Sequence, residues 1–422
     1  MILLSLFVAA SPLQPLDAIY PDLDALYREL HQAPELSSHE EKTALRLAVR
    51  MKKLGYEVHT GVGGTGVVAL LHNGPGPTVL VRTELDALPV QEQTGLPYAS
   101  QATATDPSGK TVPVMHACGH DIHMTSWFGA AELLMQAKSQ WRGTLMFVAQ
   151  PAEETVGGAR AMIKDGLFEK YGKPDFNLAV HDYATLPAGK IGLRSGFAMA
   201  NVDSVDITIF GKGGHGAFPQ NTVDPIVIAA RTVLTLQTLV SRENSPLDPA
   251  VITVGSIHGG FKHNIIPDDV HLQLTVRSYK PEVRKRLLDG IVRVVKGEAA
   301  LARAPKEPEV KFSEGQDALW NDPKLMERLS KPLAAQLGPD NVVEVDPVMG
   351  AEDFGEFGTA AHTPTAYIHI GAVNPERYAQ AKAAGEPLPA LHSSKFAPDP
   401  QPTLRTGVTT LVVSALELLG KP

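Results

Sequence analysis

The chain has 422 residues, of which 43% are hydrophobic and 20% are charged, values typical of a globular enzyme. This length exceeds the size at which a single hydrophobic core stops growing, so two domains are predicted. The formal net charge of −8, with no run of Lys or Arg, argues against a nucleic-acid partner, and no apolar run reaches the roughly 20 residues that span a bilayer.

Residues 2–10 form an apolar run that ends in small residues, like the hydrophobic part of an export signal. No basic residue precedes the run, and it is shorter than a full signal of about 15–30 residues. Two interpretations stay open: the protein is periplasmic or secreted if the run belongs to a signal peptide, and cytoplasmic otherwise. A single cysteine fits either compartment.

Helical periodicity covers residues 22–54, with an interruption near Pro34, and returns at residues 125–137 and 323–337. Apolar runs bounded by Gly, Pro or charged residues alternate with these helices. The runs show little alternation of polar and apolar residues, which favours strands covered on both faces, as in an α/β layered sheet. A proline-rich patch at residues 398–402 predicts a loop. The predicted strands are residues 66–71, 78–81, 144–149, 177–180 and 365–370.

The pattern changes near Ser195. Residues 202–210 alternate between apolar and polar side chains, which is typical of a strand with one solvated face. The predicted order of elements is β-α-β-β-α-β, the arrangement of a ferredoxin-like sandwich. We therefore predict an α/β domain made of residues 1–194 and 314–422, with an α+β ferredoxin-like domain inserted at residues 195–313. The elements of the insert are residues 202–210, 224–240, 250–258, 270–278, 282–302 and 309–312.

Residues 116–124 read HACGHDIHM and contain the only cysteine, Cys118, two residues before a histidine. A lone cysteine cannot form an intrachain disulfide. A thiolate and an imidazole two residues apart, on a backbone bent by glycine, can both reach one metal ion. The alternative is an ordinary buried cysteine beside surface histidines.

Four predicted strands lead into residues able to bind metal ions. Ligands in open α/β sheets gather outside the carboxyl ends of the strands, so these side chains can converge in one crevice. One carboxylate at a strand end is usually a helix cap or part of a solvated turn, but several strand ends with His and Glu together are hard to explain in that way. The residues are Glu84 and Asp86, Glu153 and Glu154, His181 and Asp182, and His392.

The adjacent pair Glu153 and Glu154 indicates a mechanism. Neighbouring side chains project in different directions, so one carboxylate can bind a metal ion while the other stays unligated beside a water molecule, as a general base requires. The alternative is an acid-rich first turn of the helix predicted to follow.

The motifs HACGHD, PAEET followed by GGA, GKGGHGAFP, NIIP, MGAEDF and LHS keep the order and spacing of the M20 metallopeptidase family. The chain most resembles the amidohydrolase branch, which includes hippurate, N-acyl-amino-acid and auxin-conjugate hydrolases. The resemblance runs from about Leu23 to the C-terminus. It implies a mixed-sheet, di-metal catalytic domain with an inserted lid or dimerisation domain. Glu84, where aspartate is more usual, and Asp182 depart from the family pattern and bear on substrate preference.

The resemblance also implies the roles of the site residues. Glu153 would be the general base, and Asp86 would orient a metal ligand. In related branches a carboxylate at the position of Cys118 bridges two zinc ions. Two divalent metal ions are therefore implied; thiolate and imidazole suit zinc, and manganese, cobalt or nickel are alternatives for a mixed site. The implied ligands are Cys118, His120, Glu154, His181 and His392.

Three residues of the insert correspond to substrate-contacting residues of the family. His215 resembles a histidine that stabilises the oxyanion, in some relatives supplied by a neighbouring subunit, so a homodimer through this domain is an expectation. Asn264 and Arg277 resemble residues that recognise the substrate carboxylate or help to close the site. For Arg277 the alternative is a surface salt bridge.

The implied activity is hydrolysis of the amide bond of an N-acyl amino acid, or of a similar small amide with a free carboxylate. A dipeptidase or carboxypeptidase with the same centre is an alternative. A catalytically silent binding protein is a third interpretation, which the presence of the base and all the ligands disfavours.

Overall fold

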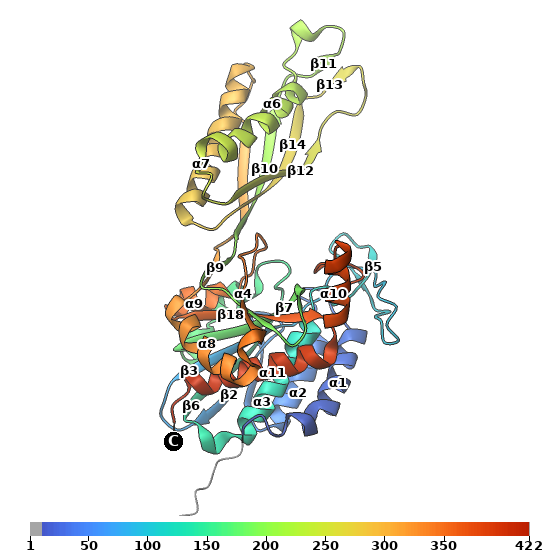
Figure 1. Cartoon of the computed structure of the whole chain (residues 1–422). Coiled ribbons are helices and arrows are strands. Elements are labelled where there is room, and N and C mark those ends of the chain that lie inside the picture. Colours follow the sequence, from blue (N-terminus) through green and yellow to red (C-terminus); the bar gives the residue numbers. More distant parts are fainter. Residues whose placement is uncertain (1–10, 422) are drawn as a thin grey trace, which may run out of the picture. The chain divides into compact units, whose positions relative to one another are not determined.

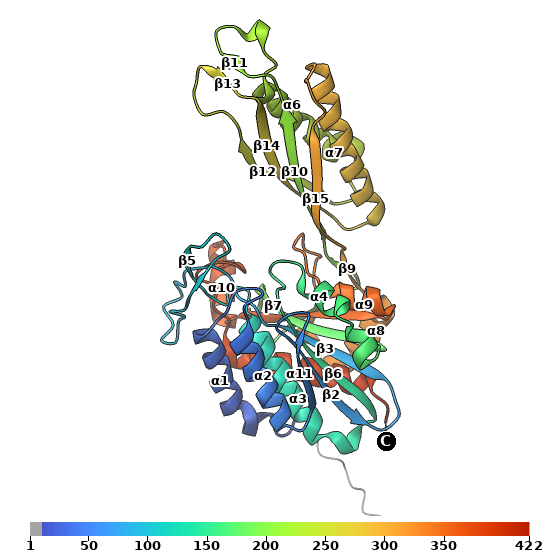
Figure 2. The same cartoon turned by 180° about the vertical axis from the view of Figure 1, so that it is seen from behind.

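The structure, a computed structural model, describes residues 11–421, so the apolar run at residues 2–10 lies outside the described residues. Within this range no helix is both long and apolar enough to cross a membrane. The described chain divides into two compact units (Figures 1 and 2). The first contains the chain up to Gly196, Trp320–Asp346 and the chain from Asp353 onward, and the second contains Phe197–Leu319 and Pro347–Glu352.

A mixed eight-stranded sheet forms the centre of the first unit (Figure 1). All the strands predicted for this unit are present, and their apolar runs are buried because helices cover both faces. The predicted α/β layered sheet is thus confirmed. In spatial order the strands are β1 (Glu57–Val62), β2 (Gly66–Asn73), β6 (Gly143–Gln150), β3 (Thr78–Glu84), β7 (Phe176–Pro187), β18 (Thr365–Val373), β8 (Ile191–Leu193) and β17 (Val342–Glu344).

The direction of the central strands decides where the loops meet. Strands β6, β3, β7 and β18 are neighbours and run parallel to one another. Strands β1 and β2, β2 and β6, and β18 and β8 pair antiparallel. The loops that follow the parallel strands therefore leave the sheet at one edge.

Five helices bury their apolar faces against one side of the sheet and share a core that includes Trp127 and Phe147. The ring centroids of Trp127 and Phe147 are 5.2 Å apart in an edge-to-face arrangement. These helices are α1 (Leu16–Gln32), α2 (Glu41–Lys53), α3 (His120–Gln136), α8 (Pro323–Leu337) and α11 (Pro400–Leu418). Shorter elements complete the unit: α4 (Gly158–Lys164), α5 (Leu167–Tyr171), α9 (Gly355–Ala361), α10 (Pro375–Ala384), β4 (Thr103–Thr105) and β5 (Thr111–Pro113).

The prediction of a loop at residues 398–402 is wrong in part, because α11 begins at Pro400. Proline is tolerated in the first turn of a helix, where its missing N–H would have no partner within the helix. Proline-rich composition alone does not separate a loop from a helix start.

The second unit has the β-α-β-β-α-β order of elements that its sequence predicts, with a short ribbon of β11 (Gly214–His215) and β13 (Ile265–Ile266) added. Its four-stranded antiparallel sheet has the order β12-β14-β10-β15, and two helices share its core. Alternate residues of β14 are buried, as expected for a sheet covered on one face. The elements are β10 (Asn201–Phe210), α6 (Pro225–Thr238), β12 (Ala250–His258), β14 (Asp269–Ser278), α7 (Pro281–Leu301) and β15 (Glu309–Gln316). Short strands β9 (Gly196–Met199) and β16 (Leu319–Asn321) lie where the chain passes between the units.

Candidate metal centre and active site

The candidate site of the first unit is built on loops that follow the parallel strands. Glu84 is the last residue of β3, and Asp86 follows two residues later. Glu153 and Glu154 come after the end of β6, and His181 lies within β7. The sequence-predicted strand ends therefore open toward one region, as expected from parallel pairing.

His120 begins α3 and presents one ring nitrogen to the site. Its Nδ1 lies 2.8 Å from the carbonyl oxygen of Asp86, which can only accept, so Nδ1 carries the hydrogen. The opposite nitrogen, Nε2, is buried and has no hydrogen-bond partner among residues 11–421. It lies 3.7 Å from Oε2 of Glu153 and 3.9 Å from Oε1 of Glu154. A buried imidazole lone pair facing two carboxylates is suited to a cation.

His181 is oriented in the same way. Its Nδ1 donates to the backbone carbonyl of Asp182 at 2.7 Å, which leaves Nε2 3.5 Å from Sγ of Cys118. Burial, with a smaller contribution from Glu154, raises the pKa of the Cys118 thiol well above its usual value. The thiol thus keeps its proton unless a cation displaces it, which couples metal binding to proton release.

His392 completes the group of predicted ligands. Its Nε2 lies 3.4 Å from Oε2 of Glu154, and its backbone N–H donates to the carbonyl of Ala117 at 2.8 Å. Donor atoms of Cys118, His120 and Glu154 all lie within 4.8 Å of one another. The structure thus brings together all five residues predicted as ligands, and their thiol, imidazole and carboxylate groups fit a divalent metal ion.

Asp86 connects two of these residues. Its Oδ2 accepts hydrogen bonds from the backbone N–H of Glu154 at 2.9 Å and from Oγ of Ser37 at 2.6 Å. Burial opposes its ionisation, but the contacts with His120 outweigh this and hold the pKa of Asp86 below its usual value. Its carbonyl and carboxylate therefore hold both His120 and Glu154 in place.

A second buried network lies behind the centre and was not identified from the sequence. The backbone N–H of Asp182 donates to Nε2 of His123 at 2.8 Å, so His123 carries its hydrogen on Nδ1 and donates it to Glu84 at 3.1 Å. Arg82 contacts the same carboxylate of Glu84, and although burial opposes ionisation, Arg82 and then His123 hold the pKa of Glu84 well below its usual range. Both ring nitrogens of His123 are engaged, so His123 is a positioning residue; its i,i+3 spacing from His120 was the available signal.

Gly119 is required by this packing. A Cβ at Gly119 would lie 1.9 Å from Oδ2 of Asp182, and its φ of 76° is left-handed. We expect Gly119→Ala to lower the free energy of unfolding by at least about 2 kcal/mol, measured by chemical denaturation. Gly109→Ala is the matched control, because Gly109 has φ 83° and nothing within 4 Å of its Cβ position. Equal losses in the two variants would show that the contact with Asp182 is not the cause.

The predicted residues of the second unit fall into two places. His215 pairs with Ile265 across the β11–β13 ribbon, and the N–H of Gly216 donates to the carbonyl of Asn264 at 2.8 Å. His215 and Asn264 therefore lie together. Arg277 lies eight residues beyond the start of β14, roughly 26 Å along the strand at ~3.3 Å per residue. The structure does not bring Arg277 to the other two residues.

Comparison with known proteins gives a consistent result. Residues 80–387 match the sequence profile of peptidase family M20/M25/M40. Thermostable carboxypeptidase 1 of Saccharolobus solfataricus is 36% identical over 399 residues, which cover 93% of this chain and 94% of the relative. Hippurate hydrolase of Campylobacter jejuni is 37% identical over 341 residues, which cover 80% of this chain and 85% of the relative.

Solved structures agree in fold. A dinuclear metal binding peptidase of the M20 family from Bacillus subtilis has a TM-score of 0.77 and 29% identity, with coverage of 96% of this chain and 100% of its own. A protein from methicillin-resistant Staphylococcus aureus has a TM-score of 0.83 and 32% identity, with coverage of 96% and 98%. The chain therefore belongs to peptidase family M20/M25/M40, whose members are hydrolases that act on carbon–nitrogen bonds.

Proposed function

We propose that this hydrolase cleaves the amide bond of N-acyl amino acids, or of similar small amides with a free carboxylate, with the help of two divalent metal ions. The single observation that carries the proposal is the convergence of five donor residues beside Glu153. Cys118, His120, Glu154, His181 and His392 would hold the ions, and their thiolate and imidazole donors favour zinc. Bound metal ions would lower the pKa of water toward about 7 and polarise the amide carbonyl.

Glu153 is the proposed general base. It is buried, and its Oε2 lies 3.7 Å from Nε2 of His120, at the edge of the proposed ligand group. In this position its carboxylate would take the proton of the attacking water and later deliver a proton to the departing amine. Asp86 would keep His120 and Glu154 in the orientation that this step requires.

For the second unit we propose the role of a ferredoxin-like lid, supported by its element order and its sheet order. His215 would stabilise the oxyanion, an effect worth roughly 3–4 kcal/mol for a well-placed donor. Asn264 and Arg277 would bind the substrate carboxylate or help to close the site. The separation of Arg277 from His215 and Asn264 supports a homodimer in which the two groups serve different active sites.

A substrate panel with controlled metal content tests this function. We expect chelation to abolish hydrolysis of hippurate and added zinc, manganese or cobalt to restore it. Hippuramide, which lacks the free carboxylate, should be cleaved at least tenfold less efficiently, as kcat/KM. Activity that survives complete metal removal would contradict the proposal.

A dipeptidase or carboxypeptidase activity is the second candidate, favoured by the similarity to a thermostable carboxypeptidase. The same panel, extended to dipeptides and C-terminally extended peptides, separates the two. Higher kcat/KM for the peptides than for N-benzoyl and N-acetyl amino acids would replace the first assignment by the second.

A further inference from the structure

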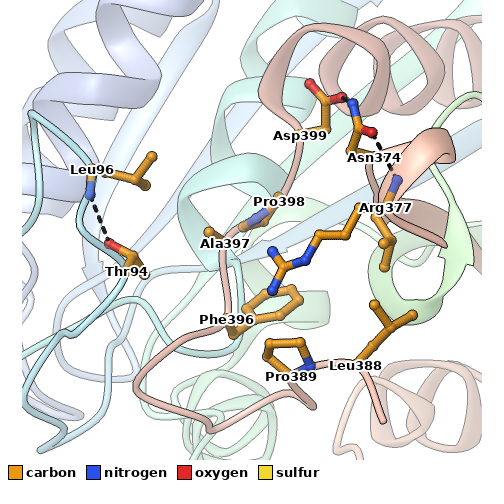
Figure 3. A pocket seen from close by; sticks show the side chains of 11 residues that line it. Thr94, Leu96, Asn374, Arg377, Leu388, Pro389, Phe396, Ala397, Pro398 and Asp399 are labelled. Atoms are coloured by element: carbon orange, nitrogen blue, oxygen red, sulfur yellow. Dashed lines mark hydrogen bonds between the residues drawn. The ribbon is translucent and has the colours of Figure 1, made fainter. Parts of the chain in front are cut away.

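A cavity of about 320 Å³ lies in the first unit, lined in part by the loop that carries His392 (Figure 3). This volume is at the lower end of the range for small-molecule sites, roughly 300–1,000 Å³. Two distant parts of the chain form it, residues 94–96 and residues 373–399. Its walls are largely apolar and include Leu96, Val373, Leu388, Pro389, Phe396 and Pro398.

Arg377 of α10 supplies a cation to the cavity. Within residues 11–421 its guanidinium makes no ion pair and no hydrogen bond. Arg377 and Phe396 both line the cavity (Figure 3). The other charged lining residue, Asp399, accepts a hydrogen bond from Nδ2 of Asn374 at 2.8 Å and points away from the guanidinium (Figure 3). The donors of Arg377 are therefore available to a ligand.

The walls of the cavity are held by bonds outside it. Thr94 donates to Glu92, whose carboxylate also lies 3.1 Å from Nε2 of His31. Burial alone would lower the pKa of His31, but Asp121 and Glu92 outweigh it and raise the pKa to about 10, so this anchor is an ion pair. On the opposite wall, the N–H of Phe396 donates to the carbonyl of Ser393 at 3.0 Å. Both walls are thus tied to neighbouring residues by hydrogen bonds.

We propose that this cavity binds a small monocarboxylate with an apolar body. The carboxylate would pair with the guanidinium fork of Arg377, whose geometry suits two parallel hydrogen bonds. The body would lie against Phe396, Leu388 and Pro389. One available cation among apolar walls matches one negative charge, whereas a polyphosphate would need several cations.

The proposed ligand, a small carboxylic acid, is also a product of the proposed reaction. Hydrolysis of an N-acyl amino acid releases an acid of this kind, so the acid product is the expected occupant; this identification rests on the proposed function, whereas the carboxylate chemistry of the cavity does not. Leu388 and Pro389 precede His392 in the chain, and Phe396 follows it. A bound acid would therefore contact the chain on both sides of a proposed metal ligand.

The test uses 4-fluorobenzoate as the probe and follows its binding by ¹⁹F NMR titration. Arg377→Gln should weaken binding at least tenfold. Lys382→Gln removes the same charge from the same helix outside the cavity and should leave binding unchanged. 4-Fluorobenzamide, a neutral probe of the same shape, should bind at least tenfold more weakly than the acid. Arg377 is exposed, and thermal unfolding will verify that its variant is folded.

Binding at the catalytic centre is separated by a Glu154→Gln background, in which Arg377-dependent binding should persist. Equal binding by the Arg377→Gln and parent proteins, or loss of all binding in the Glu154→Gln background, would overturn the proposal. No turnover is needed for this measurement. Absence of amide hydrolysis would therefore contradict the proposed function and leave the binding result to be judged separately.

Discussion

Glu153→Gln is expected to lower kcat for hippurate by about 100- to 10,000-fold, the usual contribution of a general base. Glutamine keeps the size of the side chain but cannot accept the proton of water at neutral pH. The metal content, measured by elemental analysis, should stay unchanged. A loss of less than about tenfold would remove Glu153 from the role of base.

Substitution of the adjacent residue, Glu154→Gln, separates loss of metal from loss of the general base. Glu154 lies 3.4 Å from Nε2 of His392 and 3.9 Å from Nε2 of His120, so its carboxylate lies between two proposed ligands, and Glu153 approaches Nε2 of His120 at 3.7 Å. Glu154→Gln should therefore lose metal as well as activity. Glu169→Gln, at an exposed position of α5, is the control for removing a carboxylate from this unit and should change neither quantity. Identical metal contents in the Glu153 and Glu154 variants would contradict the division of roles.

The sequence predicted the sheet well for a physical reason. A strand covered on both faces must be apolar at successive positions, so the runs at residues 66–71 and 365–370 stand out without any knowledge of their neighbours. The same reasoning placed Glu154 and His181 near one edge, because parallel strands end there.

Hydrogen bonding between distant residues was not predictable in this way. The hydrogen bonds of His123 are an example, because only the tertiary structure shows its donation to Glu84 and its acceptance from the Asp182 backbone. The cavity beside Arg377 was equally invisible, because its walls come from residues 94–96 and 373–399. A periodic pattern describes one element, whereas such sites depend on which elements meet.

Cys118→Ser is expected to remove the sulfur-to-metal charge-transfer absorption of the cobalt-substituted protein and to weaken metal binding at least about tenfold. Cys118 is the only cysteine of the chain, so a cobalt–thiolate band can arise from this side chain alone. Its Sγ lies 3.5 Å from Nε2 of His181, in a buried site where the thiol loses its proton only to a cation. Serine keeps a small polar group at the position but is a poor ligand for a borderline-soft ion.

Met124→Leu is the control for loss of a sulfur atom. Met124 is buried on α3, one turn beyond His120, and a change of similar volume in a core usually costs less than about 1.5 kcal/mol. The charge-transfer band, the metal content and hippurate hydrolysis should all survive this substitution. If the band persists in Cys118→Ser, or if cobalt bound to the parent protein shows no thiolate band, then Cys118 is not a metal ligand and the centre must be built on the imidazoles and carboxylates alone.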